Sequence, residues 1–277
     1  MNRSDNPLSI FGSPDNKLRI TSTGEPRPAG YRISGVQGRV ITEIGKAIVS
    51  GRFPPGALLP REAELLTEFG ASRPSMREAM KVLAAKGLIE MRQKVGTRVR
   101  SRDLWNMFDT DILAWHQSVG PDGAKASEAL HDLATLREVI EPATARLAAG
   151  RSTKEDLSRI ERALDRMQAA THDLARYAEA DVEFHMAVFA ASHNIMLASF
   201  SHIVGDILKR SFHIQQARYA DDRRAVEDNI LIHRKVFSAI RRGDGDAAHQ
   251  AMLKVVITGR DLLTALTGRT PAGAKRT

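Results

Sequence analysis

The chain of 277 residues contains no cysteine, only 5% aromatic residues and no long apolar run. The lack of cysteine excludes a disulfide framework and thiolate metal sites. No segment is apolar over the roughly 18 residues that a membrane-spanning helix needs. Residues 1–30 also lack the unbroken apolar core of a signal peptide. These absences predict a soluble, cytoplasmic protein without a membrane partner, and the length predicts two domains plus tails.

Positive charge is concentrated in the first third of the chain. Residues 1–100 hold 17 of the 41 Lys and Arg but only 9 of the 33 Asp and Glu, so the remaining residues hold 24 of each kind. The net charge of +8 therefore lies in the first third. This asymmetry favours a polyanionic partner, because Lys and Arg that neutralise phosphates release condensed counterions. A disordered basic tail at residues 1–35 explains only part of the excess, since many of the basic residues lie beyond it.

Residues 36–100 have the pattern of a helix-turn-helix. After an amphipathic helix at residues 40–49, Glu62 and Glu64 mark the first turn of a second helix, and Gly70 supplies its stop. Ser72 can cap a third helix, which begins after a turn of only a few residues. Two short helices joined so tightly are typical of a helix-turn-helix.

The third helix has the pattern of a DNA-recognition helix. Its apolar residues form one buried stripe, which leaves Arg73, Ser75 and Arg77 facing outward at its start, next to Ser72. The start of a recognition helix is the part that reaches base edges in the major groove. We therefore predict that Arg73 and Arg77 read bases.

A β-hairpin is predicted directly after this helix. Residues 88–91 and 97–99 alternate like strands, and the turn between them is basic and contains glycine. A hairpin in this position is typical of a wing. Gln93, Lys94 and Gly96 at its tip are predicted to meet phosphate or the minor groove.

The rest of the chain predicts helices throughout. Apolar residues recur every three to four positions, which favours an all-helical bundle. We expect residues 101–122 to form a linker and the first helix of an effector domain, residues 123–268 to form the helical ligand-binding domain, and residues 269–277 to be a disordered tail. The predicted fold class is mainly α, with an N-terminal winged helix-turn-helix and a C-terminal helical bundle.

Two pairs of residues in the helical part carry candidate chemistry. Asp181 and His185 lie four residues apart, and so share one helix face, where they form either a local hydrogen-bonded pair or two ligands of a divalent metal. Arg137 lies one turn before Glu141, so it either pairs with that carboxylate or points into a cavity. A guanidinium in a cavity binds an organic acid through two hydrogen bonds.

Several motifs resemble the GntR-type transcriptional regulators. In the first domain these are LPREAEL at residues 59–65, SRPSMREA at residues 72–79, and the glycines of residues 87–97. In the helical part, LREVIEP at residues 136–142, DVEFH at residues 181–185 and HRKVFSAI at residues 233–240 resemble the effector domain of the FadR branch, the FCD domain.

The resemblance implies a metal and effector site. Metal-containing members of the branch hold a divalent ion with an aspartate and three histidines, and the matching positions here are Asp181, His185 and His233. Val255 stands where the fourth histidine is expected. One ion of the Zn, Ni or Mn class is therefore expected, held by three protein ligands. Effector binding is expected at the same three residues and at Arg137, which matches an arginine that lines the cavity in the family.

The resemblance also implies a function. The stretch LWNMFDTDILAW at residues 104–115 is similar to members that respond to sugar acids. We therefore expect a homodimeric repressor that binds a palindromic operator and is released by a galactonate-like sugar acid. Alternatives are an activator, or a sensor of lactate, a uronate or an acyl derivative. A helical metalloenzyme is a remote alternative, because the chain has no HExxH motif, phosphate loop or nucleophile elbow.

Overall fold

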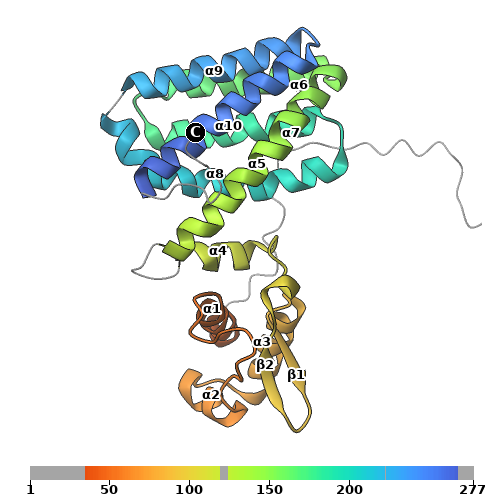
Figure 1. The fold of residues 1–277 in the computed structure, drawn as a ribbon, viewed down its shortest axis with the longest axis vertical. Coiled ribbons are helices and arrows are strands. Elements are labelled where there is room, and N and C mark those ends of the chain that lie inside the picture. The colour runs from red at the N-terminus through yellow and green to blue at the C-terminus, as the bar shows by residue number, and fades with distance from the viewer. Residues whose placement is uncertain (1–34, 119–123, 222, 268–277) are drawn as a thin grey trace, which may run out of the picture.

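The computed structural model describes residues 35–118, 124–221 and 223–267 (Figure 1). Its elements are, in order, α1 (Gly35–Val49), α2 (Glu62–Phe69), α3 (Arg73–Ala85), β1 (Ile89–Arg92), β2 (Gly96–Val99), the short 3-10 helix η1 (Arg102–Leu104), α4 (Thr110–Ser118), α5 (Ala124–Arg151), α6 (Lys154–Ala169), α7 (Leu174–Ala191), α8 (Ile195–Asp221), α9 (Arg223–Arg241) and α10 (Gly245–Thr267). The predicted fold class is confirmed. The tails predicted at the two ends lie outside the described residues, except for Gly35, which begins α1.

The first domain has one core, built mainly from α1, α3 and the hairpin. Ile44 and Ile48 of α1 meet Met76 and Leu83 of α3 in this core, and all four side chains are buried. Helix α2 contributes Leu65 and ends at Gly70, as the sequence predicted. The tight turn to α3 therefore sets the two helices of the predicted helix-turn-helix next to each other.

The wing is an antiparallel hairpin with a three-residue turn. Strand β1 pairs with β2 in the register Ile89↔Val99 to Arg92↔Gly96. Two residues of the hairpin, separated by one position, have positive φ angles. Lys94 has φ of 63° and Gly96 has φ of 105°. The conformation of Gly96 is one that residues with a Cβ rarely adopt, which explains the glycine at this position.

Helices α5 to α10 form the second domain (Figure 1). Helix α5 contacts α7, α8, α9 and α10, and the main core is built from α5, α6, α7, α9 and α10. A smaller apolar cluster, which includes Val182, Phe189 and Val204, joins α7 to α8. None of the described helices combines the length and the apolarity that crossing a bilayer requires.

Helix α4 lies between the two domains (Figure 1). The sequence predicts it as part of the effector domain, yet Ile112 and Trp115 are buried in the core of the first domain. Leu113 faces the other way and packs against Leu133 of α5. The sequence could not separate these two roles, because both faces of α4 are apolar.

Gly45 of α1 allows the close approach of α4. A Cβ placed on Gly45 would lie 2.3 Å from Cζ3 of the Trp115 ring and within 2.6 Å of two further ring atoms. Real Cβ contacts are never this short, so a side chain here would push the indole away. A glycine inside a helix is otherwise unfavourable, and this contact explains its presence.

We therefore predict that Gly45→Ala lowers the free energy of unfolding by about 1–3 kcal/mol, the usual cost of overpacking a core. The displaced Trp115 should also change the tryptophan fluorescence of the folded protein. Urea unfolding measures the first effect and emission spectra the second. Gly150→Ala is the matched control, because no heavy atom lies within 4 Å of a Cβ at that helical glycine. Equal stability of the two variants would contradict the packing described.

Candidate DNA-binding surface and effector cavity

The start of α3 is fixed by two serines. The Ser75 backbone N–H donates to Ser72 Oγ at 3.3 Å, and the two hydroxyl oxygens lie 2.9 Å apart. Ser72 is therefore the N-cap of α3, as predicted, and Ser75 is half-buried beside it. The two serines hold the first turn of α3 in place, and the hydroxyls are already engaged with each other.

Arg73 and Arg77 lie on the exposed side of this first turn. Among the described residues neither makes an ion pair, whereas the nearby Lys81 pairs with Glu78 at 2.8 Å. Exposed arginines without an acidic partner keep all of their donors available to a ligand. The positive helix end adds to the attraction for phosphate.

The wing presents a second exposed group. Gln93 and Lys94 lie at the tip and are exposed, while Arg92 pairs with Glu90 at 3.2 Å. Arg98 is bound elsewhere, because its Nη1 donates to the Gly56 carbonyl at 2.6 Å. Only part of the wing's positive charge is therefore displayed at the tip.

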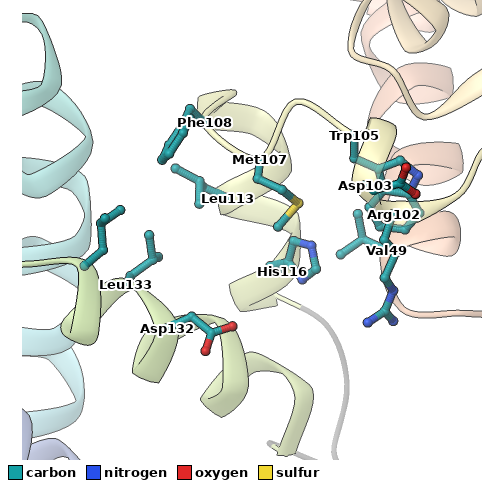
Figure 2. A pocket seen from close by; sticks show the side chains of 11 residues that line it. Val49, Arg102, Asp103, Trp105, Met107, Phe108, Leu113, His116, Asp132 and Leu133 are labelled. Carbon is teal, nitrogen blue, oxygen red and sulfur yellow. The ribbon is translucent and has the colours of Figure 1, made fainter. Parts of the chain in front are cut away.

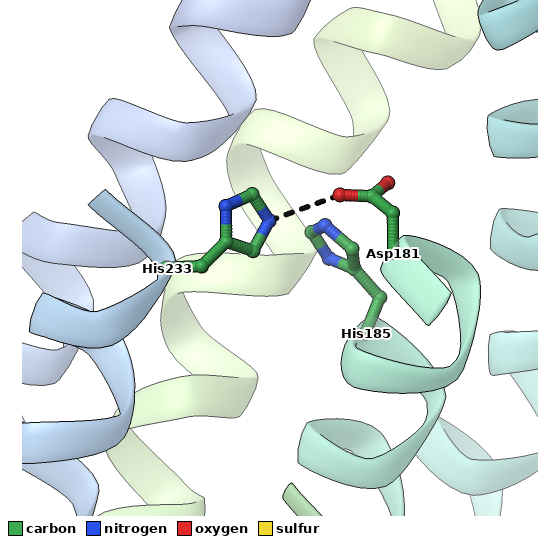
Figure 3. Close-up of side chains that lie close together, drawn as sticks. All are labelled: Asp181, His185 and His233. Atoms are coloured by element: carbon green, nitrogen blue, oxygen red, sulfur yellow. Dashed lines mark ion pairs between the residues drawn. The ribbon is translucent and has the colours of Figure 1, made fainter. Parts of the chain in front are cut away.

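Three predicted ligands meet inside the second domain. Asp181 and His185 lie on α7 and His233 on α9, and one potential ligand atom from each lies within 4.8 Å of the others (Figure 3). Both histidines are buried, and the Asp181 side chain is 16% exposed. The structure thus brings together residues that are 48 positions apart in the sequence.

The contacts made by Nδ1 of the two histidines leave Nε2 of each available to a cation. His233 Nδ1 lies 2.7 Å from the Asn229 carbonyl, which can only accept, so Nδ1 carries the proton. His185 Nδ1 lies 2.5 Å from Glu141 Oε2, with which it forms an ion pair when protonated. Partners of this kind fix the tautomer of metal-binding histidines.

His233 Nε2 faces the carboxylate of Asp181. It is buried without a hydrogen-bond partner among the described residues, and the Asp181 Oδ1 atom lies 3.2 Å away (Figure 3). A lone pair on neutral His233 and a carboxylate oxygen repel each other at this distance. A proton or a metal ion between them removes the repulsion, so the donor set of one carboxylate and two imidazoles fits a divalent ion.

Arg137 and Glu141 form a buried ion pair beside the cluster. The sequence left open whether Arg137 pairs with Glu141 or faces a cavity, and it does both, since Arg137 also lines the cavity that holds the cluster. Burial opposes ionisation of Glu141, but the charges of Arg137 and His185 lower its pKa to about 2. Burial likewise opposes ionisation of Asp181, but His233, His185 and Arg137 lower its pKa. Both carboxylates are therefore ionised at neutral pH.

The cavity itself is small in this structure. Its volume is about 30 Å³, which holds about two water molecules. Tyr177 and Asn229 form a polar part of its wall, where the Tyr177 hydroxyl donates to Asn229 Oδ1 at 2.9 Å. Leu208 and Phe212 of α8 form an apolar part, and Val255 lies in the wall as well.

Comparisons with known proteins agree with this architecture. The family described as bacterial regulatory proteins, gntR family, matches residues 36–99, and the FCD domain matches residues 132–257. The galactonate operon transcriptional repressor of Escherichia coli (strain K12) is 37% identical over 229 residues, which are 83% of this chain and 97% of that protein. The chain belongs to the GntR family of transcriptional regulators.

Two further relatives of this GntR regulator are informative. A candidate L-lactate dehydrogenase operon regulatory protein of Escherichia coli (strain K12) is 33% identical over 72% of this chain and 74% of its own. The solved structure of Lar from Listeria monocytogenes has a TM-score of 0.56 at 15% identity and covers 84% of this chain and 99% of its own, which supports the fold alone. The predicted family and the prediction that the chain is not an enzyme are confirmed, because the family and the relatives are regulators.

The sequence indicates only part of the site. Its spacing predicts Glu141 as a partner of Arg137, whereas in the structure Glu141 also contacts His185. Spacing carried a signal for Glu141, since it lies one turn from Arg137 on the same face of α5. No such signal exists for Tyr177 and Asn229, which are 52 residues apart and meet only because the bundle places both in the wall of the same cavity.

We predict that Glu141→Ala lowers the free energy of unfolding of this GntR regulator by about 3 kcal/mol or more, because Arg137 and His185 lose their buried counter-charge. Glu138→Ala on the same helix is the matched control. Glu138 pairs with Arg260 at 2.7 Å in a partly exposed place, so its loss should cost about 1 kcal/mol or less. Urea unfolding at neutral pH compares the two, and similar losses would contradict the role given to Glu141.

Proposed function

We propose that this GntR regulator represses a sugar-acid catabolic operon and leaves its operator when a galactonate-like acid binds in the FCD domain. The observation that carries the proposal is the buried group of Arg137, Asp181, His185 and His233 around one cavity. The similarity to a galactonate operon repressor supports the choice of acid. The exposed Arg73 and Arg77 support contact with DNA through α3.

Charge balance supports a metal ion followed by an acid. With both histidines neutral, Arg137, Glu141 and Asp181 give the buried group a net charge of −1. A divalent ion of the Zn, Ni or Mn class, held by Asp181 and by Nε2 of His185 and His233, would change this to +1. One carboxylate would then neutralise the site. When bound, the ion would supply positive charge to the oxygens of the acid.

Arg137 is suited to hold the same acid. Its ion pair with Glu141 engages Nε, and among the described residues its terminal nitrogens form no ion pair of their own. A guanidinium recognises a carboxylate through two parallel hydrogen bonds. Tyr177 and Asn229 add polar atoms that suit the hydroxyl groups of a sugar acid.

The DNA-binding unit is proposed to be a homodimer on a palindromic operator. Arg73 and Arg77 would read bases, with guanine as the preferred partner of arginine. Gln93 and Lys94 would meet the backbone or the minor groove from the wing, and Ser72, Ser75 and Gly96 would keep the two contacting segments in shape. Two-fold symmetry of the protein would match the symmetry of the site.

Lactate is the second candidate effector, and the same fold also suits an activator. Two observations favour lactate: the related candidate regulator of an L-lactate dehydrogenase operon, and a cavity of about 30 Å³. A six-carbon acid requires Leu208 and Phe212 to move away from the cavity, whereas a three-carbon acid requires less movement. Lactate, however, leaves Tyr177 and Asn229 with fewer hydroxyl groups to bind.

The DNA contacts are tested with operator fragments taken from beside the gene. We expect Arg73→Ala and Arg77→Ala each to weaken specific binding by about 1–3 kcal/mol and to relax base preference, whereas Lys94→Gln should weaken all sequences alike and lower the salt dependence. Fluorescence anisotropy at several salt concentrations measures both effects. Arg234→Ala, an exposed arginine of α9, is the control. Unchanged binding after loss of both Arg73 and Arg77 would refute the proposed base contacts.

The effector site is tested by thermal unfolding with D-galactonate or L-lactate, with Mn²⁺, Ni²⁺ or Zn²⁺ or after chelation. A ligand at about 100 times its Kd should raise Tm by about 5–10 °C. We expect His233→Ala to abolish the metal shift and Val255→His, which adds the fourth histidine, to enlarge it. Arg137→Lys keeps a charge beside Glu141 but removes the forked donors, so it should lose the acid shift and keep the metal shift.

His249→Ala is the control for these variants, because His249 of α10 does not line the cavity. A larger shift with lactate than with galactonate would favour the second candidate. An acid shift that survives both chelation and Arg137→Lys would place the acid outside this cavity and overturn the proposal.

A further inference from the structure

A glycine inside helix α10 stands in the wall of the effector cavity. Gly259 lies within the helical residues Gly245–Thr267 and lines the cavity together with Val255. The two residues are four positions apart, so they share one face of α10, and Gly259 is about 6 Å further along the axis. This face therefore presents a branched side chain to one part of the cavity and no side chain to the next.

The packing of α10 does not call for a glycine at this position. Apart from the neighbouring backbone of α10, no heavy atom of the described residues lies within 4 Å of a Cβ placed on Gly259. Other helical glycines differ: a Cβ on Gly45 would lie 2.3 Å from the Trp115 ring, and one on Gly205 of α8 would lie 3.4 Å from Val182. The backbone of Gly259 is helical, and glycine is less favourable than alanine there. Neither conformation nor close contact explains this glycine.

Gly259 leaves the one gap in the wall of the cavity. The other described residues that line the cavity all have side chains. Arg137 and the group of one carboxylate and two imidazoles supply the charged part of the wall, and Leu208, Phe212 and Val255 supply an apolar part. A ligand bound to the charged part therefore finds room for its remaining atoms where Gly259 has no side chain.

Ion pairs hold this part of α10 in place. Arg260 Nη1 donates to Glu138 Oε1 of α5 at 2.7 Å, and Arg260 Nη2 donates to Asp261 Oδ1 at 2.8 Å. The hydrogen bond to Asp261 and the charges of both acids raise the pKa of Arg260. Arg137 and Gly259, which precede Glu138 and Arg260 in the chain, both line the cavity. The link between α5 and α10 thus keeps the open space at Gly259 beside Arg137.

We propose that Gly259 sets the length of the acid that this regulator accepts. The space left by its missing side chain receives the carbon chain of a sugar acid whose carboxylate lies at Arg137. The inference rests on the proposed function for the acid and for the group that binds it, and it adds the residue that separates a sugar acid from a short hydroxy acid. A side chain at this position would clash with the carbons of a long acid and would leave L-lactate almost unaffected. Clashes of this kind are a common source of specificity.

A larger cavity in the described chain does not share this space. It has a volume of about 440 Å³ and lies between the two domains, where Trp105, Phe108 and Leu113 line it (Figure 2). None of the residues that line this larger cavity also lines the effector cavity. A side chain added at Gly259 therefore tests the effector cavity alone.

The proposal is tested with Gly259→Ala and Gly259→Leu in the full chain. Isothermal titration calorimetry gives the affinities for D-galactonate and L-lactate in the presence of Mn²⁺, and for Mn²⁺ itself. We expect Gly259→Leu to weaken D-galactonate binding by about 10-fold or more, and Gly259→Ala to weaken it less, because each added methylene reduces the space for the acid. The affinities for L-lactate and Mn²⁺ should stay within about threefold of wild type. Gly150→Leu is the matched control, since Gly150 is an exposed glycine of α5 outside the cavity.

A second measurement needs no acid. Thermal unfolding is followed in the metal-free wild type and in metal-free Gly259→Ala. Because no described atom occupies the Cβ position, alanine should improve the helix without a clash and raise Tm by about 2–4 °C. A lower Tm in Gly259→Ala would show that α10 needs this glycine for packing, and the role in ligand length would be wrong.

The outcomes separate this inference from the proposed function. If Arg137→Lys loses D-galactonate binding while Gly259→Leu keeps the wild-type affinity, Gly259 does not select the acid, although the proposed function stands. If the wild type binds neither acid, or if Arg137→Lys binds D-galactonate as tightly as the wild type does, the proposed function is wrong and the role of Gly259 fails with it. Tighter binding of L-lactate than of D-galactonate by the wild type would also contradict selection for length.

Discussion

The effector domain depends on how five ionisable side chains share charge inside a helical bundle. Removing a charge from water is costly unless an opposite charge or good hydrogen bonds replace the water. Here Arg137 and His185 surround Glu141, and His233 lies beside Asp181. With both histidines neutral, the group carries a net charge of −1, and the proposed cation and acid follow from this charge.

The need to compensate buried charge also bears on the residues around the two histidines. The Asn229 carbonyl accepts a hydrogen bond from His233 Nδ1, and the Glu141 carboxylate lies against His185 Nδ1, so Nε2 of each histidine is the atom left for Asp181 or a cation. Val255 occupies the wall where the family resemblance implies a fourth histidine. A metal held by three protein ligands would keep part of its coordination shell open, as the proposed binding of an effector requires.

Charge is also what joins the two halves of the molecule. The partly buried Lys86 forms ion pairs with Asp109 and Asp111, and these pairs fix the start of α4 to the end of α3. Among the described residues, the contacts of Leu113 on the other face of α4 are apolar and include no ion pair. The junction therefore has one ion-paired side and one apolar side.

The sequence by itself determined the local features of this protein. Charge location, the short turn at Gly70, the Ser72 cap and the glycine of the wing are set by neighbours along the chain, so the winged helix-turn-helix could be predicted, and so could the shared helix face of Asp181 and His185. Tertiary structure decided the rest: the contact of Glu141 with both Arg137 and His185, the hydrogen bond from Tyr177 to Asn229, and the packing of α4 in the core of the first domain. These contacts depend on which helices pack together. The residue spacing within one helix does not indicate which side chain of another helix it will contact.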